Sequence, residues 1–281
     1  MTAPATPATQ PVESIAELVR FAPDTFGFRY QHHVSLFIVT PEGVILVDPC
    51  GQNNARTPSI IKEAIRSVTD QPVKYMVYSH WGADHGIGGA VFADTAKFVG
   101  HRNVVEKIAA ANDPTSPVPE ITFDDRMALD LGGTHLDLYW AGLSAKDDYI
   151  ILHHPASRLI MTVDYVQPKN VPFKALLGHP ARTAERLKWI AENLDFDVLV
   201  SGHPSPQMTG TVADVWEARQ YFLDLSHAIE SAQSAGHADG SPEMVAAVKS
   251  SLTPAYGSWR RFDEHFPLNV EGWFRWRAEE P

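Results

Sequence analysis

The sequence predicts an α/β fold in which two β-rich halves pack sheet against sheet, with helices on the outside. Apolar, strand-like runs alternate with stretches whose apolar residues recur every three to four positions, which is typical of helices between strands. Gly- and Pro-containing turns join neighbouring strands, and this pattern occurs in both halves. No linker separates the halves. We therefore expect one domain over residues 15–281, after a flexible tail at residues 1–14.

The first half contains a predicted hairpin, then strands that alternate with helices. Pro41-Glu42-Gly43 supplies the hairpin turn. Thr57 is suited to cap a helix, with Pro58 at its first position. A second helix follows the last strand of this half. The predicted strands cover residues 35–40, 44–47, 73–78 and 97–100.

The second half begins with two predicted hairpins and ends in helices. Gly132-Gly133 is a hairpin signal, and Pro155 lies in the turn of the next hairpin. A helix at residues 181–193 precedes the last strand, and the chain after Thr211 reads as mostly helical to about residue 252. The aromatic-rich C-terminal segment is expected in the core, with a pocket cap or a dimer surface as alternatives. The predicted strands cover residues 128–131, 134–140, 149–152, 159–163 and 198–200.

Composition and charge exclude several classes of protein. The chain has 23 Lys and Arg against 34 Asp and Glu, and its net charge of −11 argues against nucleic-acid binding. It has no run of about 18 apolar residues, so we expect no membrane span. Its N-terminus lacks the pattern of a secretory signal, so we expect a cytoplasmic protein. The single cysteine, Cys50, is expected to be buried, and any metal site must use imidazole and carboxylate ligands.

The segment from Ser79 to Gly89 carries the strongest chemical signal. His80, Asp84 and His85 lie within six residues, just past a buried strand. Imidazole and carboxylate together suit zinc, iron or manganese. The alternative is a helix-capping Asp84 with two incidental histidines.

Other strands also end in polar residues. Asp48 follows the strand 44–47, Asp164 follows 159–163, and His203 follows 198–200. Ligand sites in α/β sheets lie beyond the carboxyl ends of strands, so we expect these side chains to converge at one edge.

These motifs, in this order, resemble the metallo-β-lactamase fold superfamily. The family motif His-x-His-x-Asp-His stands here as His80-Trp81-Gly82-Ala83-Asp84-His85, and Asp48, Asp164 and Gly202-His203 are similar to its other motifs. The resemblance covers roughly residues 25–205. It implies a four-layer αββα sandwich with a metal site at one edge of the two sheets.

Two departures from the family pattern define the expected metal site. Gly82 replaces the second motif histidine, and the position of another ligand histidine falls at Ser144. Only His80 remains of the three-histidine site. The resemblance implies that the other site is intact, with the ligands Asp84, His85, His203 and Asp164. We therefore predict one divalent metal ion, zinc first, with iron or manganese as alternatives.

The resemblance implies a metal-dependent hydrolase that acts on a small molecule. A metal-bound hydroxide would attack an ester, lactone, thioester or amide, with Asp84 and Asp164 holding the metal. His80 would position or deprotonate the water, or serve only as a hydrogen-bonding partner. His33, Ser144 and Lys146 are the expected substrate contacts.

Two other functions are compatible with these residues. The chain could be a catalytically impaired member that only binds a ligand, or an iron oxygenase of the persulfide-dioxygenase type, which would lack one ligand. An antibiotic-degrading β-lactamase is not expected. Nucleic-acid and membrane partners are not expected either, and a homodimer stays open. Of the other histidines, His135 is expected on an exposed strand face, and His153 and His154 in a solvated turn.

Overall fold

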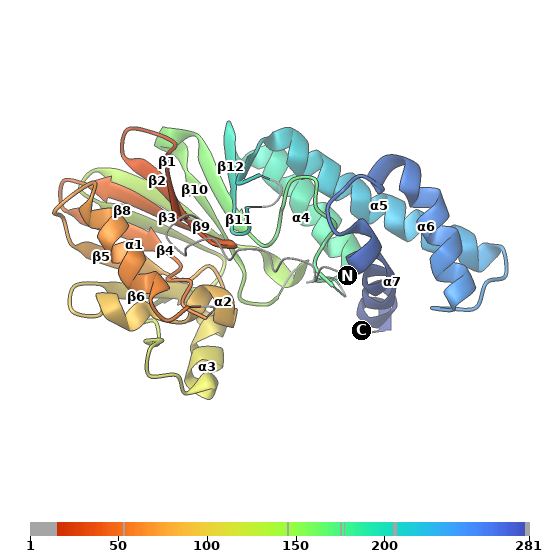
Figure 1. The fold of residues 1–281 in the computed structure, drawn as a ribbon, viewed down its shortest axis with the longest axis horizontal. Helices are drawn as coiled ribbons and strands as arrows, with labels where there is room; N and C mark the ends of the chain where they lie inside the picture. Colours follow the sequence, from red (N-terminus) through yellow and green to blue (C-terminus); the bar gives the residue numbers. More distant parts are fainter. Residues whose placement is uncertain are drawn as a thin grey trace, which may run out of the picture.

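Two β-sheets face each other, and helices cover their outer faces (Figure 1). The computed structural model describes residues 16–52, 54–144, 146–174, 176, 178–204 and 207–278. This architecture confirms the predicted four-layer αββα fold. The predicted N-terminal tail lies outside the described residues.

The first sheet has seven strands, which are adjacent in chain order. They are β1 (Ala16–Arg20), β2 (Thr25–Tyr30), β3 (His33–Thr40), β4 (Gly43–Val47), β5 (Val73–Val77), β6 (Lys97–His101) and β7 (Ile121–Phe123). Strands β4 to β7 are parallel, with α1 (Thr57–Arg66) and α3 (Arg102–Ala111) in two of their connections. Between β5 and β6 lie the short α2 (Ala83–Gly86) and the turn η2 (Gly89–Phe92).

The second sheet has six strands. In spatial order they are β13 (Thr209–Gly210), β12 (Val198–Ser201), β11 (Leu159–Val163), β10 (Ile150–His154), β9 (Thr134–Trp140) and β8 (Arg126–Leu131). The short turns η3 (Gly142–Ser144) and η4 (Pro155–Ser157) flank β10, and α4 (Pro180–Asn193) connects the parallel strands β11 and β12.

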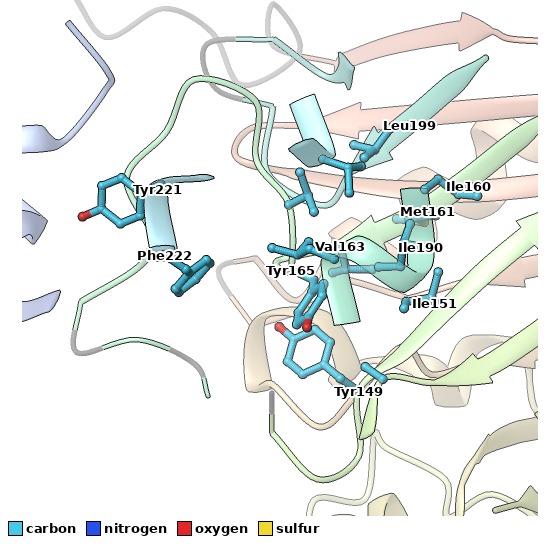
Figure 2. Packing of buried hydrophobic residues seen from close by; sticks show 14 of the residues in the cluster. Tyr149, Ile151, Ile160, Met161, Val163, Tyr165, Ile190, Leu199, Tyr221 and Phe222 are labelled. Atoms are coloured by element: carbon cyan, nitrogen blue, oxygen red, sulfur yellow. The ribbon is translucent and has the colours of Figure 1, made fainter. Parts of the chain in front are cut away.

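Strand β3 shows why the central strands are apolar throughout. Leu36 and Ile38 belong to the core that the two sheets share, whereas Phe37 packs in the cluster beneath α1 and α3. A strand buried on both faces shows a continuous apolar run rather than an alternating one. Similarly, α4 contributes Ile190 to the packing behind the second sheet (Figure 2).

Three helices follow the second sheet. They are α5 (Val212–Ser234), α6 (Pro242–Tyr256) and α7 (Phe262–Ala278). Helix α5 packs against α4, and α6 and α7 pack against α5 and each other (Figure 1). Trp259, Phe262, Phe266 and Trp273 are buried, which confirms that the aromatic C-terminal segment joins the core. None of the described helices is long and apolar enough to span a membrane.

Several local predictions were wrong. His153 and His154 are buried in β10, because their ring nitrogens face the Asp195 carbonyl and the Thr25 hydroxyl. Helix α1 begins at Thr57, and its cap is Arg56 without a side-chain bond. The predicted helical end near residue 252 was also wrong, because helices accommodate Pro254 and Pro267.

Four strands, β1, β2, β7 and β13, have no counterpart among the predicted elements. Strand β1 is largely exposed, β7 and β13 are short, and β2 contains a glycine, so their sequence signals are weak. Two single-residue predictions were confirmed, since His135 is exposed on β9 and Cys50 is buried.

Candidate metal centre

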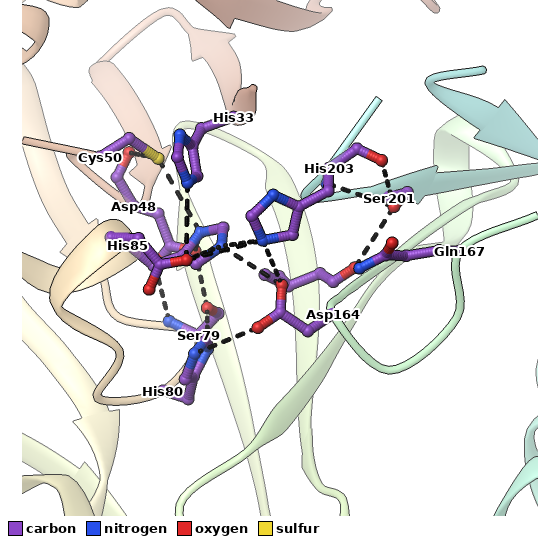
Figure 3. A network of polar contacts seen from close by, with 12 residues as sticks. His33, Asp48, Cys50, Ser79, His80, His85, Asp164, Gln167, Ser201 and His203 are labelled. Atoms are coloured by element: carbon purple, nitrogen blue, oxygen red, sulfur yellow. Dashed lines mark hydrogen bonds and ion pairs between the residues drawn. The ribbon is translucent and has the colours of Figure 1, made fainter. Parts of the chain in front are cut away.

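The strand ends of the two sheets meet at one edge and bring polar side chains together (Figure 3). Asp48 follows β4 and His80 follows β5 in the first sheet, whereas Asp164 follows β11 and His203 follows β12 in the second. The convergence that the sequence predicted is therefore present.

Four potential metal ligands form a tight group. One donor atom from each of His33, Asp84, His85 and His203 lies within 4.8 Å of all the others. Oδ2 of Asp84 is 3.5 Å from Nε2 of His33, 3.7 Å from Nε2 of His85 and 3.6 Å from Nε2 of His203. Asp164 borders this group, with Oδ1 at 2.8 Å from Nε2 of His203 and 3.3 Å from Nε2 of His85.

The hydrogen bonds of two histidines show that this group suits a cation. Nδ1 of His85 lies 3.2 Å from Oδ2 of Asp48, and Nδ1 of His203 lies 2.9 Å from the His32 carbonyl. Each Nδ1 therefore carries a hydrogen. Burial opposes the protonation of His85, but in the absence of a metal ion Asp164 and Asp48 raise its pKa well above its ordinary value, so its Nε2 is protonated as well. A metal ion would take the place of that proton. The two Nε2 atoms are 3.2 Å apart, so a proton or a metal ion must lie between their lone pairs.

The spacing of the donors also fits one small metal ion. Ligands about 2.0–2.1 Å from a tetrahedral zinc ion lie about 3.3 Å from one another. The separations between Asp84, His85, His203 and Asp164 bracket this value. These residues therefore fit a metal ion.

The charges of the group are strongly coupled. Burial raises the pKa of Asp164, but the adjacent His85 and His203 hold it well below its ordinary value. Burial also opposes the ionisation of Asp84, whose pKa is nevertheless lowered by the hydrogen bond to His33 and the charge on His85. Burial lowers the pKa of His33, so its ring is neutral at neutral pH and able to coordinate a metal. Both carboxylates are thus ionised.

Asp48 supports the group from beneath. It is fully buried, and its carboxylate accepts hydrogen bonds from the Ser79 amide at 2.9 Å and the Ser79 hydroxyl at 2.6 Å. Its contact with Nδ1 of His85 fixes that ring. Asp48 therefore orients a ligand and lies behind the donor atoms.

His80 has a free ring nitrogen that faces Asp164. The Ser79 hydroxyl donates to Asp48, so Nδ1 of His80, 3.0 Å from that hydroxyl, acts as the donor to its oxygen. Nε2 of His80 forms no hydrogen bond within the described part of the chain and lies 3.6 Å from Oδ2 of Asp164. Burial lowers the pKa of His80 to about 4, so the ring is neutral.

Tyr149 lies beside His80 and was not predicted as a site residue. Its ring stacks on the His80 ring, with centroids 4.0 Å apart, and its hydroxyl donates to Oδ2 of Asp164 at 2.5 Å. A Cβ at Gly82 would lie 2.6 Å from Nε2 of His80, so position 82 borders the same space. The only sequence signal for Tyr149 is its place just before a buried strand.

Asp148 is a second residue that sequence reasoning missed. It is fully buried and accepts hydrogen bonds from the Trp81 amide at 2.6 Å and the Lys107 ammonium at 2.7 Å. It therefore anchors the motif between His80 and Asp84 to the second sheet.

The three predicted substrate contacts have different positions. His33 lies within the ligand group rather than in an outer pocket. The Lys146 ammonium lies 6.0 Å from the centroid of the Tyr149 ring, on the edge of the site. Ser144 ends η3, and its side chain lies outside the described part of the structure.

Comparisons with known proteins agree with this geometry. Residues 29–203 match the family model of the metallo-beta-lactamase superfamily. No curated protein matches the chain in sequence. A stereoselective inverting sec-alkylsulfatase from Pseudomonas sp. is similar in structure, with a TM-score of 0.76, 14% identity and coverage of 94% of this chain and 51% of that protein.

A metallo-beta-lactamase from Pontibacter korlensis is also similar. Its TM-score is 0.63 at 20% identity, with coverage of 74% of this chain and 99% of that protein. The present chain spans about half the length of the alkylsulfatase. At sequence identities this low, the similarity to these two structures shows that the fold is shared and nothing further.

Proposed function

This chain belongs to the metallo-beta-lactamase superfamily, and from this membership we propose that it is a metal-dependent hydrolase with one divalent ion. The superfamily includes hydrolases such as lactamases and alkylsulfatases. The observation that carries the proposal is the convergence of Asp84, His85, His203 and Asp164 beside a fully buried Tyr149. The donor set favours zinc, with iron or manganese as alternatives.

Tyr149 and Gly82 support the proposal of a single ion. The family's other metal would be held by three histidines and would share Asp164, but here His80 is the one histidine retained from that set. The Tyr149 hydroxyl binds the Asp164 oxygen that faces His80, and Gly82 offers no donor. A second ion would therefore lack ligands and compete with Tyr149 for Asp164.

The proposed chemistry follows from the donors around this site. A metal ion held there would lower the pKa of water from 15.7 towards about 7 and so supply hydroxide at neutral pH. Asp164 uses one oxygen towards the ligand group, while Tyr149 fixes the other. His80 presents a neutral Nε2 that faces Asp164 and is suited to accept a hydrogen bond from water there. Because its pKa is lowered to about 4, we propose that it positions this water rather than deprotonates it.

The proposed substrates are small molecules with an ester, lactone, thioester or amide bond. Lys146 is suited to attract an anionic substrate group, since its ammonium lies at the edge of the site near Tyr149. We also propose that the protein acts in the cytoplasm without nucleic-acid or membrane partners, in accordance with its net charge of −11. A homodimer remains a proposal that size-exclusion chromatography tests.

Metal analysis of the zinc-loaded protein tests the proposal. We expect about one equivalent of zinc, and less than half an equivalent in the Asp84→Ala and His203→Ala variants, since each lacks a ligand. Asp70→Ala removes an exposed carboxylate outside the site and serves as the matched control. Two equivalents in the wild type would contradict the single-ion site.

Hydrolysis assays separate an enzyme from a member of the fold that only binds ligands. The zinc-loaded protein should hydrolyse p-nitrophenyl esters, and the Asp84→Ala variant should not. Full zinc occupancy without turnover of any ester, lactone, thioester or amide would favour the binding protein. Oxygen consumption by an iron-loaded sample with a persulfide would favour the oxygenase.

A further inference from the structure

His33 lies at the start of β3, outside every motif that carries the family resemblance, yet its ring faces the candidate metal centre (Figure 3). The residue is 6% exposed. Its ring meets the rings of His85 and His203 edge to face, with centroids 5.3 Å and 4.8 Å away. A buried imidazole from a third segment of the chain therefore brings another nitrogen donor to Asp84.

The backbone on both sides of His33 is bonded to the segment that carries His203. The Val34 amide donates to the Gly202 carbonyl at 2.8 Å. The His32 carbonyl accepts a hydrogen bond from Nδ1 of His203 at 2.9 Å. These two bonds hold the start of β3 against the end of β12, so His33 and His203 stay side by side.

The distance between His33 and Asp84 fits two ligands of one ion better than an ion pair. Nε2 of His33 lies 3.5 Å from Oδ2 of Asp84. A charge-assisted N–H···O bond is shorter, about 2.7–2.9 Å, whereas two ligands of one zinc ion lie about 3.3 Å apart. The same Asp84 oxygen is 3.7 Å from Nε2 of His85 and 3.6 Å from Nε2 of His203. His33 therefore stands towards Asp84 as the two expected histidine ligands do.

We propose that His33 is a ligand of the metal ion rather than a substrate contact. This inference rests on the proposed function, because it adds a donor to the same ion. Three imidazoles, from β3, from α2 and from the segment after β12, would then hold the ion together with Asp84 and Asp164. The family pattern lacks two histidines here, at Gly82 and Ser144, and His33 supplies one imidazole from a different strand.

The metal affinity of matched histidine variants tests this assignment. His33→Ala should weaken zinc binding more than about 100-fold in competition with a chelator, since loss of an outer partner of a ligand alone costs about 10- to 100-fold. His32→Ala is the control, because this side chain is exposed and its bond to His203 uses the backbone carbonyl, which alanine retains. Thermal unfolding with excess chelator verifies that both metal-free variants are folded. Equal zinc affinity of His33→Ala and the wild type would overturn the proposal.

The absorption spectrum of the cobalt-loaded protein separates a ligand from a residue that only orients Asp84. Removing a ligand changes the visible d–d bands of Co²⁺, whereas removing a partner of a ligand acts mainly on affinity. We expect an altered spectrum in His33→Gly at saturating cobalt, and added imidazole should restore the wild-type spectrum by filling the vacated space. Imidazole should leave the spectrum of His32→Gly unchanged. A wild-type spectrum in His33→Gly without imidazole would overturn the role of His33 as a ligand.

The outcomes separate this inference from the catalytic proposal. An altered cobalt spectrum in His33→Gly, in a protein that hydrolyses no ester, lactone, thioester or amide, would support the ligand and remove the hydrolase. Hydrolysis by a wild type whose metal affinity and cobalt spectrum do not depend on His33 would keep the hydrolase and remove the ligand.

Discussion

At the scale of single residues, the two oxygens of Asp164 have different partners. Oδ1 lies near His85 and His203, whereas Oδ2 accepts from the Tyr149 hydroxyl and faces His80. Residues that hold a metal ligand in place affect metal affinity by about 10- to 100-fold. Tyr149 should therefore govern how well Asp164 binds a metal.

We predict that Tyr149→Phe weakens zinc binding about tenfold, because Asp164 then loses the hydrogen bond that fixes its orientation. Competition with a chelator of known affinity measures the change. Tyr75→Phe, on β5 and away from the site, is the control and should bind zinc like the wild type. Equal zinc affinity in both variants would show that Tyr149 does not position Asp164.

Restoring the family's missing histidine should not restore a second metal. A Cβ at position 82 would lie 2.6 Å from Nε2 of His80 and 2.8 Å from Oδ1 of Asp84, so the space is already occupied. We predict that Gly82→His lowers the free energy of unfolding by about 1–3 kcal/mol and binds no more than one equivalent of zinc. Thermal unfolding and metal analysis measure both effects.

The Gly82→Ala variant separates the steric part of this effect. It adds the same Cβ without an imidazole, so its loss of stability should be similar. A second equivalent of zinc in Gly82→His would mean that Tyr149 and His80 move aside easily, which the close packing of their rings argues against.

At the scale of elements, strand ends set the positions of the site residues. Val163 ends β11 with a φ of 48°, a backbone conformation that β-branched residues rarely adopt. Its carbonyl accepts a hydrogen bond from the Gly202 amide at 3.0 Å. This turn links the ends of β11 and β12, which carry Asp164 and His203. Such strained residues cluster at functional sites.

Helix α5 begins with a capping box that stabilises its first turn. The Thr211 hydroxyl accepts from the Ala213 amide, and the Asp214 carboxylate accepts from the Thr211 amide. We predict that Thr211→Ala lowers the free energy of unfolding by about 1 kcal/mol and Tm by about 2–4 °C. Calorimetry measures the shift.

Ser234 provides a matched control at the other end of α5. Its hydroxyl donates a hydrogen bond to the Glu230 carbonyl one turn earlier in the same helix. This bond caps no helix end, so Ser234→Ala should leave Tm nearly unchanged. Equal shifts in the two variants would contradict a special role for the cap.

At the scale of the whole molecule, the candidate metal centre joins the two sheets. His85 lies in α2, directly after strand β5 of the first sheet, whereas Asp164 and His203 follow strands β11 and β12 of the second sheet. An ion that binds only the folded chain stabilises it by about 2.7 kcal/mol at a concentration 100 times its Kd. We therefore predict that zinc raises Tm and that a chelator reverses the increase.

Calorimetry with matched samples tests this stabilisation. Magnesium at the same concentration should have little effect, because it prefers oxygen ligands and retains its water. Asp84→Ala should abolish the zinc-dependent increase, while Asp70→Ala should retain it. An equal increase in the Asp84→Ala variant would place the stabilising zinc elsewhere.

Much of the fold was predictable because its signals are local. Strands β3, β4 and β5 appear as apolar runs, and the Gly132-Gly133 turn joins β8 to β9 as expected. The buried His153 and His154 were mispredicted, because their partners Asp195 and Thr25 are distant in the sequence.

The sequence by itself determined the class of fold and the residues that end its strands at the site. Periodicity and turn residues act over a few positions, and the order of the motifs adds the family. Only the tertiary structure decided that His33 joins the ligand group and that Tyr149 binds Asp164. These are contacts between distant segments, and their geometry depends on how the two sheets pack together.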